Sequence, residues 1–317
     1  MPKLASKLPL EIKAVNRTNL LSALELVHGC LKTTSMLWMH ALGLRVLLGV
    51  VVSDWSKASA NAVNGFARAG RFSELLLRID MPHKRWTRRR GGYTLPLAKV
   101  PDAVKELKRE GMIAVLLEPF PPYSDEYSLA GVTAADQEKL TIEVVGAGFD
   151  ASDILRSDLQ PHERWEASLA PITSRMTPEP PMCRRIHLMG QAEYRRSVQG
   201  RLEKIGARLA NPAFPDAVLR DPARDSRKLA ESAIAYLKST RQTILLKHAE
   251  SYSPIPEKHI STFANNVQKL LSGLAAYGIR LGPCSFAAGV LPKRGLIFWD
   301  FFPAREQEAA SLYPPGL

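Results

Sequence analysis

The sequence predicts an α+β fold, and three observations lead to that class. Segments typical of strands cluster between residues 46 and 145 and return after residue 285. The region 190–280 has a mostly helical pattern. The chain has 317 residues, of which 45% are hydrophobic and 23% charged, which are ordinary proportions for a globular protein with a sizeable core.

In the first half of the chain, apolar runs and glycines indicate where helices, turns and strands lie. Residues 17–30 predict a short helix that ends near Gly29. The run KTTSMLWMHALGLRVLLGVVVS (32–53) is about as long as a membrane span, but Arg45 lies near its middle, where a charge costs at least ~2.5 kcal/mol in a bilayer. We therefore expect a soluble helix over Thr33–Leu42, a turn at Gly43 and a buried strand over Val46–Ser53.

Later elements follow in order from hydrophobic periodicity and from Pro and Gly punctuation. Residues 260–277 carry the clearest helical period, with apolar residues three and four apart. A turn is expected at 119–128, and the Pro-rich passage 171–181 reads as a linker or long surface loop. The remaining predicted helices are 56–69, 104–109, 193–209 and 227–240, and the remaining strands are 74–80, 112–118, 140–145, 285–291 and 296–302. We predict two subdomains, 1–170 and 171–317.

Composition bounds the environment and the partners. The 43 Lys and Arg outnumber the 31 Asp and Glu, which gives a formal charge of +12 and suits an anionic partner such as a nucleotide or a nucleic acid, or else is merely a basic surface. The three cysteines form no CxxC pair, the seven histidines show no zinc-type spacing, and the N-terminus lacks an apolar signal core. We expect a cytoplasmic protein that does not enter a membrane.

Several basic residues lie where a phosphate chain could be bound. A triphosphate needs cations and backbone N–H groups from a glycine-containing loop. Lys32, Arg78 at the end of a predicted strand, and the loop RWTRRRGG with Arg90, Gly91 and Gly92 supply both. Alternatively, Lys32 is a solvated residue, and Arg78 pairs with Asp80 or a neighbouring acid. The loop is then a tight basic turn or, with its flanking aromatic residues, a nucleic-acid contact.

Acidic residues and one histidine complete the candidate set. Asp300 lies between two aromatic residues in an apolar strand, where a carboxylate needs a cation, a metal or several donors. Glu143 and Asp300 together are candidates for holding Mg²⁺, which prefers one or two carboxylates plus phosphate oxygens. His162 is a candidate acid, base or phosphate acceptor, or a structural histidine.

The spacing of the apolar run carries a resemblance. Lys32, Gly43, Val46, Gly49 and Ser53 follow the pattern K-x-x-x-L…G-x-x-V-P-x-G-F-V-V-T. This pattern resembles the opening of the nucleotide-binding domain of phosphoenolpyruvate synthase and pyruvate phosphate dikinase. The resemblance implies an ATP-grasp-like fold, in which a nucleotide cleft lies between two α+β subdomains and the lysine contacts ATP phosphates.

Later positions resemble further motifs of that family, in the same order. Arg78 is similar to the arginine of its V-R-S-S strand, a phosphate ligand, and Glu118 to its hinge residue. Glu143 resembles the glutamate of I-E-A-x-x-G-L-G-E, with Asp150 and Asp153 near that segment's second acid. These positions imply that Lys32, Arg78, Glu118 and Glu143 line a nucleotide site.

The departures from the family pattern concern the metal ligands. The final strand pair resembles D-I-E-W-A…L-Q-A-R-P, but Ser285 and Ala287 replace the two acids, Asp300 replaces the glutamine and Phe302 the arginine. The resemblance implies an ATP·Mg²⁺-dependent phosphotransferase of kinase or dikinase type, or a ligase, whose phosphate acceptor is a small molecule or a separate protein. The lost acids favour, alternatively, a catalytically degenerate binding or regulatory protein.

Overall fold

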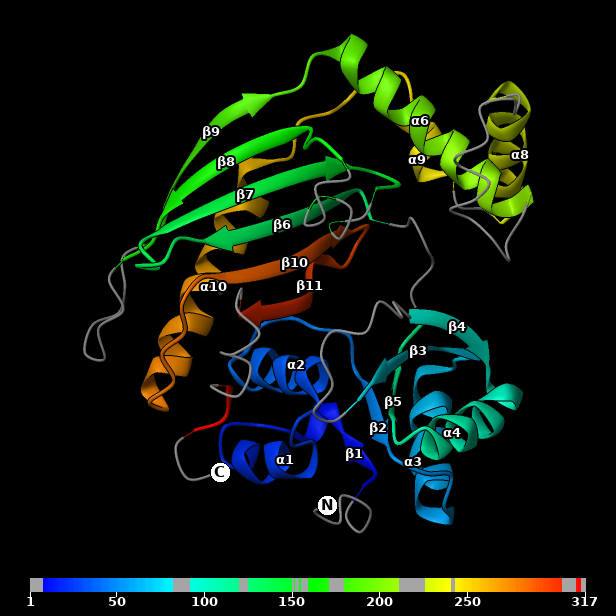
Figure 1. The fold of residues 1–317 in the computed structure, drawn as a ribbon, viewed down its shortest axis with the longest axis vertical. Coiled ribbons are helices and arrows are strands. Elements are labelled where there is room, and N and C mark those ends of the chain that lie inside the picture. Colours follow the sequence, from blue (N-terminus) through cyan, green and yellow to red (C-terminus); the bar gives the residue numbers. More distant parts are fainter. Residues whose placement is uncertain are drawn as a thin grey trace.

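The computed structural model describes residues 8–81, 92–119, 125–149, 151, 154, 159–170, 180–210, 226–240, 243–303 and 312–314. In this part of the chain, two antiparallel sheets are joined side by side and helices pack against both (Figure 1). The predicted α+β class is therefore confirmed.

Sheet A has five strands in the order β1-β2-β5-β3-β4, and all its pairs are antiparallel. Its central strand β5 is buried along its whole length, as the run of Ile, Ala, Val and Leu predicts. The strands are β1 Leu10–Glu11, β2 Gly49–Val52, β3 Glu74–Asp80, β4 Gly92–Pro96 and β5 Ile113–Leu117.

Sheet B has six strands in the order β11-β10-β6-β7-β8-β9, again all antiparallel. It combines strands from the middle of the chain with the C-terminal pair, which lies at its edge nearest to sheet A (Figure 1). The strands are β6 Tyr127–Thr133, β7 Lys139–Gly146, β8 Glu163–Ser168, β9 Met182–Leu188, β10 Cys284–Leu291 and β11 Gly295–Pro303.

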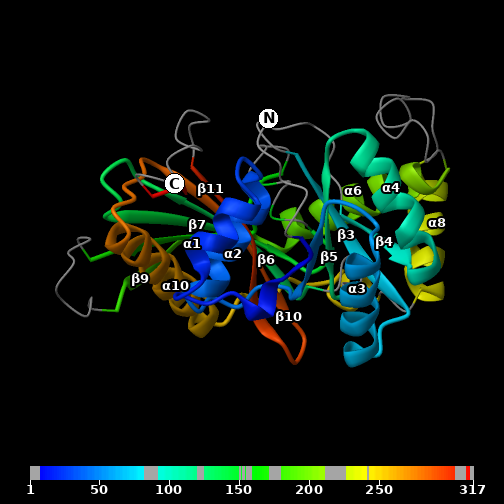
Figure 2. The same cartoon turned by 90° about the horizontal axis from the view of Figure 1, so that it is seen from below.

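The helices that the structure describes form four groups. Helices α3 and α4 cover sheet A, α10 lies behind sheet B, and α6, α8 and α9 extend from the end of sheet B (Figure 1). Figure 2 shows α1 and α2 between α10 and the strands of sheet A. Their bounds are α1 Leu20–Leu26, α2 Leu31–Ala41, α3 Lys57–Gly70, α4 Val100–Arg109, α6 Gln191–Ala210, α8 Ser226–Ser239, α9 Ile244–Lys247 and α10 Glu257–Ala276; short 3-10 turns lie at Ile12–Ala14 and Leu97–Lys99.

The apolar run 32–53 holds the two sheets together. Helix α2 ends at Ala41, and Gly43 adopts a φ of +80°, which glycine tolerates without strain. The chain then runs extended beside β11: Val46 bridges Phe298, and the Phe298 N–H donates to the Arg45 carbonyl at 2.8 Å. The predicted helix, turn and strand are confirmed, although the regular strand begins only at Gly49. Within the described residues, none of the helices has the length and apolarity that crossing a bilayer requires.

Most locally periodic segments form the predicted element, but several strands of sheet B were not predicted. The segment 119–128, expected to be a turn, contains the first two residues of β6, Tyr127 and Ser128, and that part of the prediction is wrong. Strand β8 alternates buried and exposed residues, but its first buried residue is Glu163, which hides the pattern from a hydropathy reading. Strand β9 is almost wholly exposed, so it has no apolar period to detect.

The predicted subdomain boundary lies inside one sheet. Strands β6 to β8 precede residue 170, whereas β9, β10 and β11 follow it, and all six belong to sheet B. The C-terminal segment therefore completes a sheet that the first segment begins. The two predicted subdomains, 1–170 and 171–317, share a hydrophobic core, because residues of both lie in one buried cluster.

Candidate functional site

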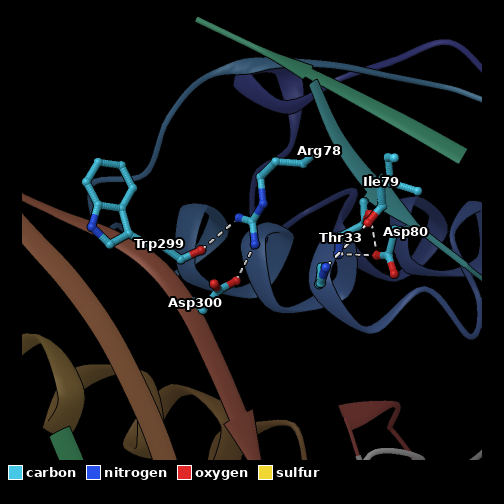
Figure 3. Close-up of polar contacts among 7 residues, drawn as sticks. Thr33, Arg78, Ile79, Asp80, Trp299 and Asp300 are labelled. Carbon is cyan, nitrogen blue, oxygen red and sulfur yellow. Dashed lines mark hydrogen bonds and ion pairs between the residues drawn. The ribbon is translucent and has the colours of Figure 1, made fainter. Parts of the chain in front are cut away.

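The first turn of α2 is fixed by an acid from sheet A. Cys30, at the N-cap position, makes no side-chain capping bond. Instead, the Thr33 N–H and hydroxyl both donate to Asp80 Oδ2 at 2.8 Å (Figure 3). The Met81 N–H donates to Asp80 Oδ1 at 2.9 Å. Asp80 is buried and occupies the positive end of the helix. This contact sets the position of Lys32, the second residue of α2.

Arg78 lies two residues before Asp80 on β3 and reaches across to sheet B. Its Nη1 donates to the Trp299 carbonyl at 3.0 Å, and its Nη2 donates to Asp300 Oδ1 at 2.5 Å (Figure 3). A bulge explains why one strand offers both acceptors. Ala287 pairs with Asp300 and Ala288 with Phe298, so Trp299 is the extra residue on β11.

Lys32 completes the cluster from the side of α2. Its Nζ is 3.5 Å from the carbonyl oxygen of Ile79. Burial lowers the pKa of Lys32, the positive charge of Arg78 lowers it further, and the carboxylates of Asp300 and Asp80 oppose these effects. The pKa of Asp80 is raised by burial, against the hydrogen bonds from Thr33. The cluster is defined here as Lys32, Arg78, Asp80 and Asp300.

The cluster has the composition of an anion site. Lys32 offers a compact ammonium charge, and Arg78 a planar fork that suits phosphate or carboxylate. Asp80 is engaged by the start of α2, which leaves Asp300 as the acid that faces Arg78. Sequence reasoning weighed Asp80 only as a partner for Arg78 and missed its role at the helix start. An acid that closes the apolar run ELLLRID is the signal that could have indicated it.

Glu118 makes its contacts outside the cluster and links the two sheets. Its Oε1 accepts from the Leu48 N–H at 3.1 Å and pairs with Arg294 at 2.7 Å. Arg294 sits at the turn between β10 and β11, and its carbonyl accepts a hydrogen bond from Arg45. Arg45, the charged residue inside the apolar run 32–53, therefore links this run to the turn between β10 and β11.

Glu143 and Asp300 are not neighbours. Glu143, Ala130, Ala287 and Asp300 occupy one row across β7, β6, β10 and β11. Strands lie about 4.8 Å apart, so their backbones are about 14 Å apart, whereas Mg²⁺ binds each ligand oxygen at about 2 Å. The predicted pair does not fit one ion. Glu143 instead accepts from Arg164 at 2.6 and 2.9 Å. Among the residues that the structure describes, no three His, Cys, Asp or Glu side chains gather around a point.

His162 is enclosed between sheet B and α6. It has no exposed surface, and its ring contacts Phe149, Tyr194 and Tyr252 edge-on. The Gly146 N–H donates to His162 Nδ1 at 2.9 Å, so the proton of the neutral ring is on Nε2, which lies 3.3 Å from Ser197 Oγ. Burial lowers the pKa of His162 to about 3. This tautomer cannot take a proton from Ser197, which favours the structural alternative for His162, and its catalytic role stays a prediction.

The basic glycine loop is described only at one end. Arg90 and Gly91 lie outside the described residues, as do Asp150 and Asp153. Gly92 is the first residue of β4 and pairs with Arg78 on β3. The structure thus brings together Lys32, Arg78 and Asp300 and places Gly92 beside Arg78, while Glu118, Glu143 and His162 lie elsewhere.

Comparisons with known proteins give little to add to this geometry. No protein-family model matches the chain, and no curated protein matches it. One solved structure that matches is macrocyclase MdnC from Microcystis aeruginosa MRC, bound with the precursor peptide MdnA. The identity is 12% and the TM-score 0.34, and the match covers 96% of this chain but only 60% of that protein. A similarity this weak identifies neither a fold family nor an activity.

Proposed function

We propose that this chain is an ATP-binding protein of ATP-grasp type that transfers a phosphoryl group or ligates an acceptor at the expense of ATP. The observation that carries the proposal is the convergence of Lys32, Arg78 and Asp300. They come from α2, β3 and β11. The ordered resemblance to phosphoenolpyruvate synthase implies phosphate contacts for Lys32 and Arg78, whereas Asp300 replaces the family's glutamine.

The proposed roles follow from the chemistry of the side chains. Lys32 neutralises a phosphate as a point charge, and because burial and the charge of Arg78 lower its pKa, an added anion would favour its charged form. Arg78 binds two oxygens of one phosphate through its fork. Phosphoryl transfer depends mainly on such positioning and charge neutralisation. Mg²⁺ accompanies ATP in the proposal, but Glu143 and Asp300 do not hold one ion together, and no step is assigned to it.

Calorimetry of ATP binding tests the proposal. Lys32→Ala should weaken binding at least about tenfold, because a charge-assisted hydrogen bond is worth roughly 1.5–3 kcal/mol. Lys105→Ala, in the exposed face of α4, is the matched control and should bind as the wild type does. Equal affinity in wild type and Lys32→Ala, or no binding in either, contradicts the proposal.

A second function is favoured by one contact. Arg78 is neutralised from within the chain by Asp300, an arrangement that suits a protein that binds nucleotide without turning it over. ATP hydrolysis assays with and without Mg²⁺ separate the two functions. Turnover that requires Mg²⁺ and disappears in Arg78→Gln supports the enzyme; tight ATP binding without turnover supports the binding protein.

A further inference from the structure

Arg78 has its hydrogen-bonding fork occupied from within the chain. Both terminal nitrogens are engaged, Nη1 by the Trp299 carbonyl at 3.0 Å and Nη2 by Asp300 Oδ1 at 2.5 Å. These are the donors that a bidentate phosphate would use. The β11 bulge therefore presents to Arg78 a carboxylate and a carbonyl in the place of two phosphate oxygens (Figure 3).

The pair between Arg78 and Asp300, which spans the two sheets, is open to water, unlike a structural ion pair within sheet B. The side chains of Arg78 and Asp300 are 16% and 28% exposed. Glu163, in contrast, is fully buried and accepts from Tyr252, Trp165, Ile255 and Arg185 at 2.6–3.1 Å. Removing Glu163 would leave the donors of Tyr252, Trp165 and Ile255 without their acceptor inside the protein, whereas Asp300 can be hydrated when it leaves Arg78.

The charges around Asp300 make it exchangeable with a stronger anion. Lys32 and Arg78 face it, and the effect of Arg78 on the pKa of Lys32 shows that the two cations repel each other. One carboxylate carries a single negative charge, whereas the triphosphate of ATP carries about four and can engage both cations. A polyphosphate therefore gains more from this cluster than Asp300 does.

We propose that Asp300 is a specificity-determining residue, an internal competitor that occupies Arg78 until a polyphosphate displaces it. The inference rests on the proposed nucleotide function and specifies its ligand class. Every anion that uses Arg78 must first displace Asp300. This lowers the affinity for all of them, so that only ligands with several phosphate charges remain well bound.

Calorimetry with tripolyphosphate and with ATP tests the competitor. Asp300→Asn keeps the shape and removes the charge, and it should tighten tripolyphosphate binding about twofold to fivefold, the size expected for loss of a partly exposed charge pair. In an Arg78→Gln background the same change should give no gain, because the competitor then has nothing to block. Asp300→Glu keeps the charge and should bind as the wild type does.

Asp102→Asn is the matched control, since it removes one negative charge from a side chain that is 78% exposed in the first turn of α4. It should not change the affinity. If Asp300→Asn binds as the wild type does or more weakly, while Lys32→Ala still binds ATP more weakly, Asp300 is not a competitor. The proposed nucleotide function is then unaffected. Absence of binding in every variant overturns the nucleotide function itself. Should Asp300→Asn fail to fold by circular dichroism, Asp300→Ser gives the same comparison.

Discussion

Asp300 and Glu163 are both carboxylates on strands of sheet B, and their surroundings give them different roles. Glu163 is fully buried and bound by four donors, which is how a protein stabilises a charge in its interior. Asp300 is partly exposed and faces a guanidinium at the edge of the sheet. Residue identity alone does not separate these roles; exposure and the number of donors do.

His162 should make the protein sensitive to acid. Its folded pKa lies near 3, below the ordinary value of 6.5, so below pH 6.5 the unfolded state binds a proton that the folded state does not. Stability from this residue is thus complete above pH 6.5 and is lost as the pH falls toward 3, at about 1.4 kcal/mol per pH unit.

His162→Asn tests this. The free energy of unfolding in urea should fall by about 2 kcal/mol less between pH 7 and pH 5 than it does in the wild type, because the titrating ring is gone. His187→Asn, at an exposed histidine of β9, is the control and should keep the wild-type pH dependence. An unchanged slope in His162→Asn would show that other groups cause the acid loss.

At the scale of elements, α2 depends on a strand for its start. The helix has no side-chain cap of its own, and Asp80 of β3 supplies one through Thr33. This contact joins sheet A to the helix that carries Lys32, so the two cations of the cluster are positioned by one carboxylate. Propensity could predict the helix over Thr33–Leu42, but the element that caps it is distant in sequence.

Helices α6 and α8 approach each other too closely for a side chain at one position. A Cβ at Gly206 would lie 1.7 Å from the Leu229 carbonyl oxygen, which is backbone and cannot move away alone. Gly206→Ala should therefore lower the free energy of unfolding by about 1–3 kcal/mol, as overpacking does.

Gly200 offers a control on the same helix. A Cβ there meets nothing within 4 Å, so Gly200→Ala should raise stability by about 0.5–1 kcal/mol through helix propensity. Urea unfolding of both variants gives the comparison. Equal effects at the two positions would mean that α6 and α8 are not packed as described.

At the scale of the whole molecule, residues 312–314 lie against the start of helix α2, far away in the sequence. The Gly29 N–H donates to the Tyr313 hydroxyl at 2.7 Å, Thr34 Oγ1 lies 2.8 Å from that hydroxyl, and the Trp38 indole donates to the Leu312 carbonyl at 2.8 Å. These contacts hold the turn before α2. The residues 312–314 thus support the helix that carries Lys32.

Tyr313→Phe tests this closure. Removal of the hydroxyl leaves the Gly29 N–H without its acceptor and should cost about 1–2 kcal/mol in unfolding free energy. Tyr277→Phe is the control: its hydroxyl donates to the Arg17 carbonyl at 3.3 Å in an exposed position, and its loss should cost less than about 0.5 kcal/mol. A Tyr313→Phe variant as stable as Tyr277→Phe would contradict a supporting role.

Much of the fold could be predicted from the sequence where the pattern is local. Strand β3 has the predicted bounds, the ends of β10 and β11 differ from the prediction by at most one residue, and α10 begins three residues earlier than predicted. The strands β8 and β9 could not be found, because a buried glutamate and an exposed edge leave no hydrophobic alternation. The pairing of β8 with β7, and of β9 with β8, is what makes them strands.

The sequence by itself determined the α+β class, the helix, turn and strand of the run 32–53, and the basic residues from which an anion site can be built. These depend on spacing along the chain. Only the tertiary structure decided that Arg78 pairs with Asp300 rather than with Asp80, and that Glu143 lies three strands away from Asp300. It also decided that a backbone N–H fixes the tautomer of His162. Strand register, a single bulge and the contact between two sheets set those relations, and none of them is a local property of the sequence.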